Sequence, residues 1–190
     1  MQNKALRLNE HSSDDALRFG CCQGDALAQK YLYQRWFGKL LGVPMRYTSN
    51  REEAIEVLNT AFLKIFESIQ NYRMTEKGTF SGWMARIVFN TSIDFVRKKS
   101  NYQQKYDWNA EADLPIENEV LGKLAAEDIY QFIQQLPATT RSVFSLFALD
   151  GYKHSEIAEM LEITEGTSRW HVGQARKTLR TLVSNHYLNA

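Results

Sequence analysis

The sequence lacks the residue patterns that metal sites, phosphate loops and common catalytic centres require. Its 190 residues include only two cysteines and four histidines, with no Cys/His cluster and no His-Glu-x-x-His pair. Cys21 and Cys22 are adjacent, which disfavours a disulfide between them, and two thiols alone do not make a zinc site. No Gly-x-x-x-x-Gly-Lys phosphate loop and no Gly-x-Ser-x-Gly elbow occurs. We therefore expect no catalytic residues, no metal, no cofactor and no small-molecule substrate.

Long apolar runs are also missing. No segment approaches the roughly 20 apolar residues that a membrane-spanning helix needs, and residues 1–15 contain no apolar signal core. The alternation of apolar and polar residues that marks β-hairpins is absent as well. Because 44% of the residues are nevertheless hydrophobic, the sequence predicts an all-α protein with buried cores, located in the cytoplasm.

The net charge of +1 conceals an uneven distribution along the chain. Residues 1–100 carry 15 basic and 10 acidic side chains, whereas residues 101–128 carry two basic against seven acidic, a net charge of −5. This acidic stretch contains Pro115, and its first part has little apolar periodicity, as is typical of a linker. We predict a helical domain at 1–100, an acidic linker at 101–125 and a second helical domain at 126–190.

Helical periodicity is clear on both sides of the acidic stretch. Apolar residues recur every three or four positions in 25–42, 51–72 and 79–99, and again in the segments before and after Pro137. The segment at 79–99 ends in three basic residues, Arg97, Lys98 and Lys99.

Residues 154–180, HSEIAEMLEITEGTSRWHVGQARKTLR, predict two helices joined by a tight turn, with Thr164 placed to cap the second one. A stripe of small and apolar residues runs along the second helix: Ser168, Val172, Ala175, Leu179 and Leu182. Offset by one residue lies a basic face: Arg169, Gly173, Arg176 and Arg180, with Trp170 and Lys177 beside them. This arrangement is typical of a helix-turn-helix whose second helix enters the major groove of DNA. By themselves these residues are about equally compatible with the solvated face of a structural helix.

In this order, the segments resemble the extracytoplasmic-function (ECF) sigma factors, small two-domain sigma subunits of bacterial RNA polymerase that belong to the sigma-70 family. The resemblance covers roughly residues 14–183. In the N-terminal part it is carried by GDALAQKYLYQRW, EEAIEVLNTAFLKIFESIQNYR and GTFSGWMARIVFNTSIDFVRKK. In the C-terminal part the shared frame consists of Leu136-Pro137, Arg141, Val143-Phe144, Gly151, Glu156-Ile157-Ala158, Leu161, Ile163, Gly166-Thr167, Ala175-Arg176 and Leu179.

The resemblance implies a protein that binds core RNA polymerase and directs promoter-specific transcription initiation. Polymerase contacts are expected on the helix at 51–69, through Glu52, Glu56, Asn59, Thr60 and Leu63. The minus-ten promoter element is expected to meet Ile87, Asn90, Arg97, Lys98 and Lys99. The minus-thirty-five element is expected to meet Thr167, Ser168, Arg169, Trp170, His171, Arg176, Lys177 and Arg180, with Trp170 open between a DNA contact and a protein contact. Members of this family are commonly held by an anti-sigma factor, often membrane-anchored.

The sequence departs from the family's pattern in three places, one of which is a pair of adjacent residues. Asn59 and Thr60 stand where many members carry Gln-Glu, and Lys153 stands where a Ser or Thr cap is usual. Glu162 replaces the glycine of the helix-turn-helix, so either the turn differs or a left-handed glutamate costs about 1 kcal/mol.

Two other functions stay open at this point. One is a free-standing helix-turn-helix repressor or activator, which would normally dimerise to read two half-sites. The other is an adaptor that does not bind DNA and whose basic helix binds an acidic protein.

Overall fold

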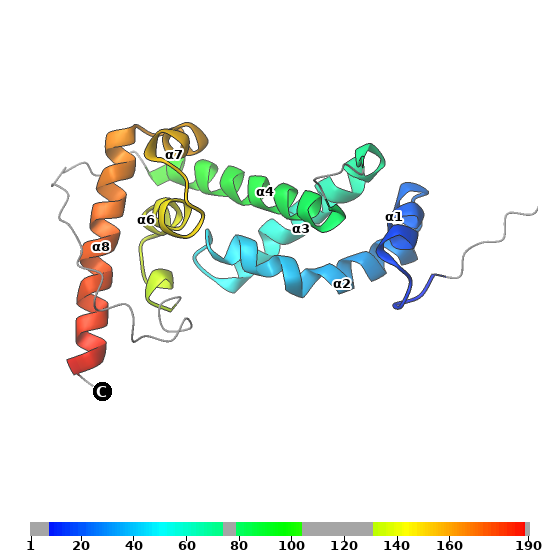
Figure 1. Ribbon diagram of the computed structural model, residues 1–190, viewed down its shortest axis with the longest axis horizontal. Coiled ribbons are helices and arrows are strands. Elements are labelled where there is room, and N and C mark those ends of the chain that lie inside the picture. Colours follow the sequence, from blue (N-terminus) through cyan, green and yellow to red (C-terminus); the bar gives the residue numbers. More distant parts are fainter. Residues whose placement is uncertain (1–7, 74–78, 104–130, 189–190) are drawn as a thin grey trace, which may run out of the picture. The chain divides into compact units, whose positions relative to one another are not determined.

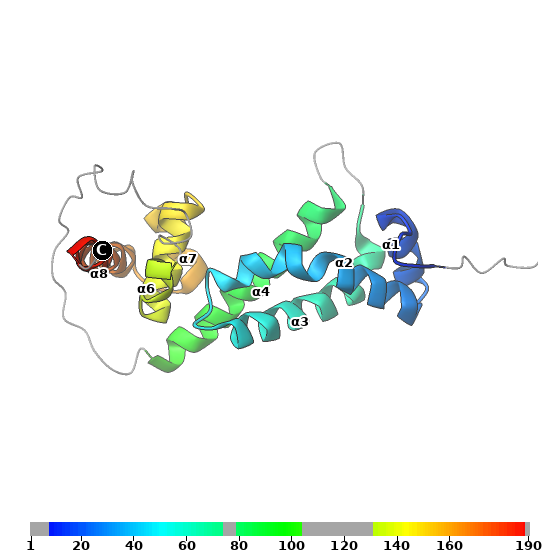
Figure 2. The same ribbon diagram turned by 90° about the horizontal axis from the view of Figure 1, so that it is seen from below.

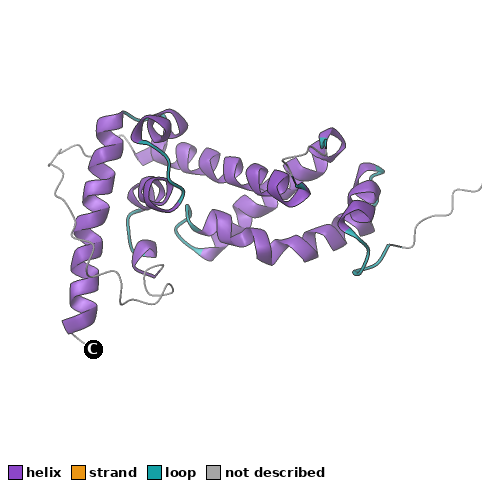
Figure 3. Cartoon of the chain, in the orientation of Figure 1, coloured by secondary structure: helices purple, strands orange, loops and turns teal. Residues whose placement is uncertain are grey.

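The computed structural model describes residues 8–73, 79–103 and 131–188. All regular secondary structure in these ranges is helical, which confirms the all-α prediction (Figures 1 and 3). Most of the predicted acidic linker lies outside the described residues. The chain forms two compact units, one comprising Met1–Met45 and Glu52–Ser92 and the other comprising Arg46–Arg51 and Ile93–Ala190.

The first unit is built on helices α1 (Asp14–Cys22), α2 (Ala26–Met45) and α3 (Arg51–Ser68), the short 3-10 helix η1 (Ile69–Asn71) and the first part of α4 (Phe80–Gln103). In both ribbon views α2 and α3 run alongside each other, and α1 packs on α2 near its N-terminal end (Figures 1 and 2). One apolar core joins these helices, with Leu17, Leu32, Leu58, Phe62, Ile65, Met84 and Val88 among its buried members. Along α3 the apolar repeat is buried at Ala54, Leu58, Phe62 and Ile65, while Ile55 and Phe66 are half-buried.

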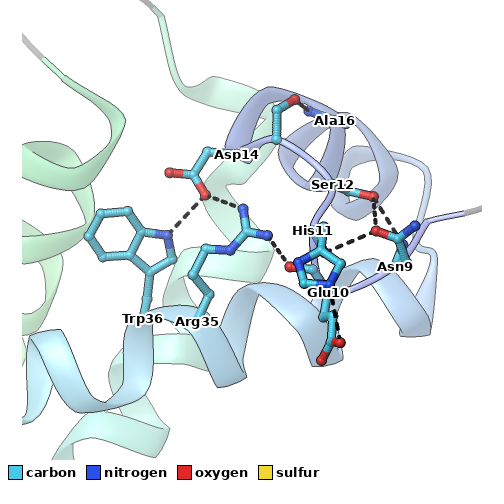
Figure 4. A network of polar contacts seen from close by, with 9 residues as sticks. Asn9, Glu10, His11, Ser12, Asp14, Ala16, Arg35 and Trp36 are labelled. Carbon is cyan, nitrogen blue, oxygen red and sulfur yellow. Dashed lines mark hydrogen bonds and ion pairs between the residues drawn. The ribbon is translucent and has the colours of Figure 1, made fainter.

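Side chains cap the N-terminus of α1 and connect both α1 and the segment before it to α2. Ser13 Oγ accepts a hydrogen bond from Ala16 N at 3.2 Å, which caps α1. Asp14 Oδ1 accepts from Arg35 Nη1 at 2.9 Å and from Trp36 Nε1 at 3.3 Å (Figure 4). The same arginine donates through Nη2 to the carbonyl oxygen of Glu10 at 2.5 Å. Arg35 therefore binds both the first turn of α1 and the loop that leads into it.

The crossing of α1 over α2 is tight enough to require a glycine. Gly20 is buried, and a Cβ atom placed on it would lie 2.7 Å from Ala28 Cβ and 2.7 Å from Leu8 Cδ1. Real Cβ atoms do not approach other carbons this closely, so any larger residue would push the helices apart. Gly38, on the exposed side of α2, has no such neighbour within 4 Å.

These two glycines should respond oppositely to the same substitution. Gly20→Ala should lower the free energy of unfolding by about 1–3 kcal/mol, because it overpacks the helix crossing. Gly38→Ala should raise it by about 0.5–1 kcal/mol, because alanine is the better helix former. Urea unfolding followed by circular dichroism measures both values, and an equal gain for the two variants would contradict the tight crossing.

The second unit contains α6 (Ala138–Phe144), the π-helical turn η3 (Ser145–Leu149), α7 (His154–Leu161) and α8 (Glu165–Leu188). Helices α6 and α7 both pack against α8. Pro137 precedes α6, which confirms the predicted break there, and Gly151, with a φ of 77°, follows η3. The apolar core includes Val143, Leu146, Ile157, Leu161, Val172 and Ala175.

A buried arginine and a buried aromatic ring add polar contacts to this core. The Arg141 side chain is only 3% exposed and donates to the carbonyl oxygen of Leu136 at 2.8 Å, to Gln134 Oε1 at 3.1 Å and to the carbonyl oxygen of Thr48. Tyr47, which belongs to the same unit, donates its hydroxyl hydrogen to Asp150. Burial and this hydrogen bond hold the pKa of Tyr47 well above its usual range.

Candidate nucleic-acid interface

The turn between α7 and α8 has the geometry of a helix-turn-helix. Glu162 follows α7 with φ 56° and ψ 41°, the left-handed conformation, and is the only described non-glycine residue with a positive φ. Ile163 N donates to the carbonyl oxygen of Ala158 at 3.0 Å, so the chain reverses directly after the last turn of α7. The left-handed conformation considered for Glu162 from the sequence is confirmed.

Both helices of the motif begin with a side-chain cap. Thr164 Oγ1 accepts from Thr167 N at 3.0 Å, as the sequence predicted for α8. At the start of α7, where Lys153 offers no acceptor, Glu156 Oε2 accepts from Lys153 N at 2.7 Å. The sequence analysis missed this second contact, although a glutamate three residues after the cap position is a known signal for it.

Helix α8 presents the two faces that its spacing predicted. Ser168, Val172 and Ala175 are buried, while Leu179 and Leu182 are half-buried. On the opposite face Arg169, Lys177 and Arg180 are exposed, and Arg176 is half-buried.

Three of the predicted DNA contacts on α8 are turned inward. Thr167 is 5% exposed and Ser168 is fully buried, with its Oγ 2.9 Å from His154 Nδ1. His171 is half-buried, and its Nδ1 lies 3.0 Å from Thr140 Oγ1 on α6. These side chains make contacts within the protein, and their predicted contact with bases stays a prediction.

Trp170 and Arg176 lie at the edge of the basic face. Trp170 is half-buried, with its ring edge-on to His171 at a centroid distance of 4.8 Å, and its Nε1 has no solvent access and no hydrogen-bond partner among the described residues. This favours the protein contact among the two roles left open for it. The Arg176 guanidinium carbon lies 5.9 Å from the ring centroid of Phe147, whose other contact is a stacked His154 ring at 4.5 Å.

The residues that flank 74–78 carry an aromatic cluster that was not predicted from the sequence. The rings of Tyr72, Phe80 and Trp83 lie with centroids 5.2–5.7 Å apart, and the Arg18 guanidinium carbon lies 5.6 Å from the Tyr72 centroid. The cluster brings together η1's flank and the first turn of α4, on either side of residues 74–78. Tyr72 follows η1 and Phe80 begins α4, so the two residues do not belong to one helix and helical periodicity could not have paired them.

Farther along α4, the predicted DNA contacts differ in how they are engaged. Ile87 is half-buried and Asn90 is exposed. Arg97 forms ion pairs with Asp94 at 3.0 Å and with Glu162 at 3.1 Å, within the second unit. Lys99 Nζ donates to Ser49 Oγ at 3.3 Å, and Lys98 is exposed.

The predicted polymerase contacts on α3 all lie on one exposed face. This face consists of Glu52, Glu56, Asn59, Thr60 and Leu63. Leu63 is 63% exposed and is among the few large apolar side chains left uncovered in the described residues. Asn59 Oδ1 accepts from the Tyr33 hydroxyl at 2.8 Å, which orients its amide.

Across the described ranges, no helix is long and apolar enough to cross a membrane. The same residues hold no group of three or more His, Cys, Asp or Glu side chains that could bind a metal ion.

The environment of His171 predicts how stability depends on pH. Burial lowers the pKa of His171 to about 4, from 6.5 for the free side chain. Between these two values the unfolded chain binds a proton that the folded chain does not, so this histidine makes stability fall as pH drops from 6.5 towards 4. His171→Asn removes the titration while keeping a polar group near Thr140, and should flatten the slope of unfolding free energy against pH. Identical slopes for wild type and His171→Asn would contradict the account.

Comparison with known proteins identifies the family. The model for Sigma-70 region 2 matches residues 32–102, and the model for Sigma-70, region 4 matches residues 126–179. The ECF RNA polymerase sigma-E factor of Haemophilus influenzae is 27% identical over 187 residues, which cover 92% of this chain and 97% of that protein. The RNA polymerase sigma-H factor of Pseudomonas aeruginosa is 27% identical over 169 residues, covering 83% of this chain and 86% of that protein.

Among solved structures, the sigma factor RpoE in complex with the anti-sigma factor NepR from Bartonella quintana matches with a TM-score of 0.45 and 19% identity, covering 82% of this chain and 96% of that one. The two matched sigma-70 regions follow each other in the order of the two helical segments described above. The chain belongs to the sigma-70 family of RNA polymerase sigma factors and is a member of its extracytoplasmic-function group.

Proposed function

We propose that this sigma factor binds core RNA polymerase through the exposed face of α3, captures the minus-ten element with α4 and reads the minus-thirty-five element with α8. The protein performs no chemistry of its own, because nucleotide addition belongs to the polymerase. Its place of action is the cytoplasm. Its partners are core polymerase, promoter DNA and an anti-sigma factor. The anti-sigma factor is included because members of this family are commonly bound by one.

The observation that carries this proposal is the combination of a region 2 and a region 4 in one chain. A free-standing repressor needs only a helix-turn-helix and a means to dimerise. The region 2 match over residues 32–102, with its uncovered α3 face, favours a polymerase subunit over a repressor. The same match argues against an adaptor that uses only its basic helix.

Capture of the minus-ten element is supported by side chains along α4 and just before it. Unstacking a base costs a few kcal/mol, and polar and aromatic side chains offset this cost by hydrogen bonding and stacking. Ile87 and Asn90 lie one turn apart on α4, and Trp83 and Phe80 of the aromatic cluster precede Asn90 on the same helix by seven and ten residues. Lys98, which is exposed, is placed to bind phosphate.

The experiment that tests the proposal is reconstitution of transcription. Purified protein is added to bacterial core polymerase with a library of promoter-containing DNA fragments, and the 5′ ends of the transcripts are mapped. Defined start sites that depend on the added protein support the proposal. Binding to DNA fragments without any effect on core polymerase would instead support a repressor or activator.

Charge reversal on α3 should separate polymerase binding from folding. The double variant Glu56→Arg and Asn59→Arg should weaken binding to core polymerase by about tenfold or more, because it places two like charges where the partner accepts an acidic, partly apolar face. The matched control combines Asp15→Arg on α1 with Gln23→Arg directly after α1, makes the same change in net charge at two other exposed sites and should bind normally. Binding is measured by co-purification and titration, with circular dichroism as the check on folding. Equal binding of both double variants would place the interface elsewhere.

The two ends of the basic face should differ in what they recognise. Lys177→Ala should weaken binding of the holoenzyme to all promoters about equally and reduce the slope of log affinity against log salt by about 0.9, because one counterion fewer is released. Arg169→Ala should relax the preference at one base pair of the minus-thirty-five element, because Arg169 lies near the start of α8. The measurement is binding to single-base promoter variants at two salt concentrations. A uniform loss for Arg169→Ala would make it a phosphate contact.

A further inference from the structure

The first turns of α8 expose very few side chains that could reach a base. Between Thr164 and His171, the inward-facing Thr167 and Ser168 leave only Thr164, Glu165, Gly166 and Arg169 classed as exposed. The Thr164 hydroxyl is already bonded to Thr167, at both its backbone nitrogen and its hydroxyl oxygen. Glu165 and Arg169 are therefore the only long polar side chains that this end of the helix presents.

These two side chains are bonded to each other. Arg169 Nη2 donates to Glu165 Oε2 at 2.9 Å, across one turn of α8. Because Thr164 supplies the helix cap, the Glu165 carboxylate is not needed there and is available to the arginine. As a surface ion pair alone, this contact would contribute little to stability, since both side chains are about half exposed.

The pairing changes what Arg169 can recognise. A guanidinium group has five N–H donors in a rigid plane, so one bond to a carboxylate leaves donors for two parallel bonds to O6 and N7 of guanine. The carboxylate also neutralises the local charge and repels phosphates, which disfavours a backbone contact for this arginine. A lone arginine at the same place would sample many rotamers and lose more entropy on binding a base.

We propose that Glu165 is a positioning residue for promoter specificity: its carboxylate holds the Arg169 guanidinium in the orientation that reads a guanine of the minus-thirty-five element. The proposal rests on the function proposed above and adds a second residue to the base-reading site. The proposal concerns Glu165 and not the other exposed acidic residues of the motif, because Glu165 forms the ion pair with Arg169 near the start of α8.

The test uses holoenzyme made from core polymerase and wild-type or variant protein, with a promoter library randomised across the upstream element. Bound and unbound fractions are sequenced to give the preference at every base pair. Glu165→Ala should reduce discrimination by about threefold to tenfold at the same base pair that Arg169→Ala affects. The double variant should be no worse than Arg169→Ala alone, because the two residues act as one unit. Glu165→Gln keeps an acceptor for Arg169 and should restore part of the preference.

Glu159→Ala serves as the control, because it removes an exposed acid from α7. It should change the affinity for all library members by one factor and leave base preference unchanged. The same uniform change for Glu165→Ala, with Arg169→Ala still selective, would overturn the positioning role while leaving the proposed function intact. Wild-type holoenzyme without any preference in the upstream element would count against the proposed function itself.

Discussion

The left-handed backbone at Glu162 is the constraint on which the DNA-facing part of this protein depends. It sets the direction in which α8 leaves α7, and a residue with a Cβ atom adopts it at a cost of about 1–2 kcal/mol. Contacts on both sides of the turn offset this cost: Ile163 N bonds to the carbonyl oxygen of Ala158, and Ile157 and Leu161 are buried. The glutamate also makes an ion pair with Arg97 that a glycine could not make. Glu162 thus combines a strained turn with a side-chain contact, which gives a physical reason for its presence in place of glycine.

The sequence predicted the helices and most of their buried faces, because apolar residues repeat with the period of the helix whatever lies against them. It placed Ser168 in the buried stripe of α8 but did not predict that Thr167 beside it is buried as well. The predicted buried stripe on α8 had about one residue per turn, as is typical of a helix that packs against a single other helix. Since α6 and α7 both pack on α8, the buried arc is wider and includes polar residues next to the apolar ones. The width of a buried face depends on the number of packing partners, which the spacing along one helix does not contain.

Polar pairs between distant residues account for the remaining differences. His154 lies against Ser168, fourteen positions later, and Thr140 against His171, thirty-one positions later. Each pair joins α8 to a helix that packs on it, and so favours one packing register of the helix-turn-helix. Ser168 and His171 make these contacts within the protein, although the family resemblance assigns them to DNA. A buried polar atom without its partner costs about 1–3 kcal/mol, so such pairs favour a single packing of the three helices. The neutral His171 is the direct consequence, because a charge there would be desolvated.

Under the proposed function, few exposed side chains of α8 read the DNA sequence, and the whole chain carries a net charge of only +1. A protein that displaces few counterions has weak non-specific affinity for DNA, since that affinity grows with the number of phosphates neutralised. In the proposed role of Glu165, one arginine held by a glutamate would add base discrimination without adding net charge. Under the proposed function, tight promoter binding therefore requires that polymerase hold the sigma factor close to the DNA, where even weak contacts act at high effective concentration. The uncovered face of α3 and the sparse reading end of α8 are then two parts of one arrangement: the first supplies the affinity for the assembly, and the second selects where on the DNA the assembly starts.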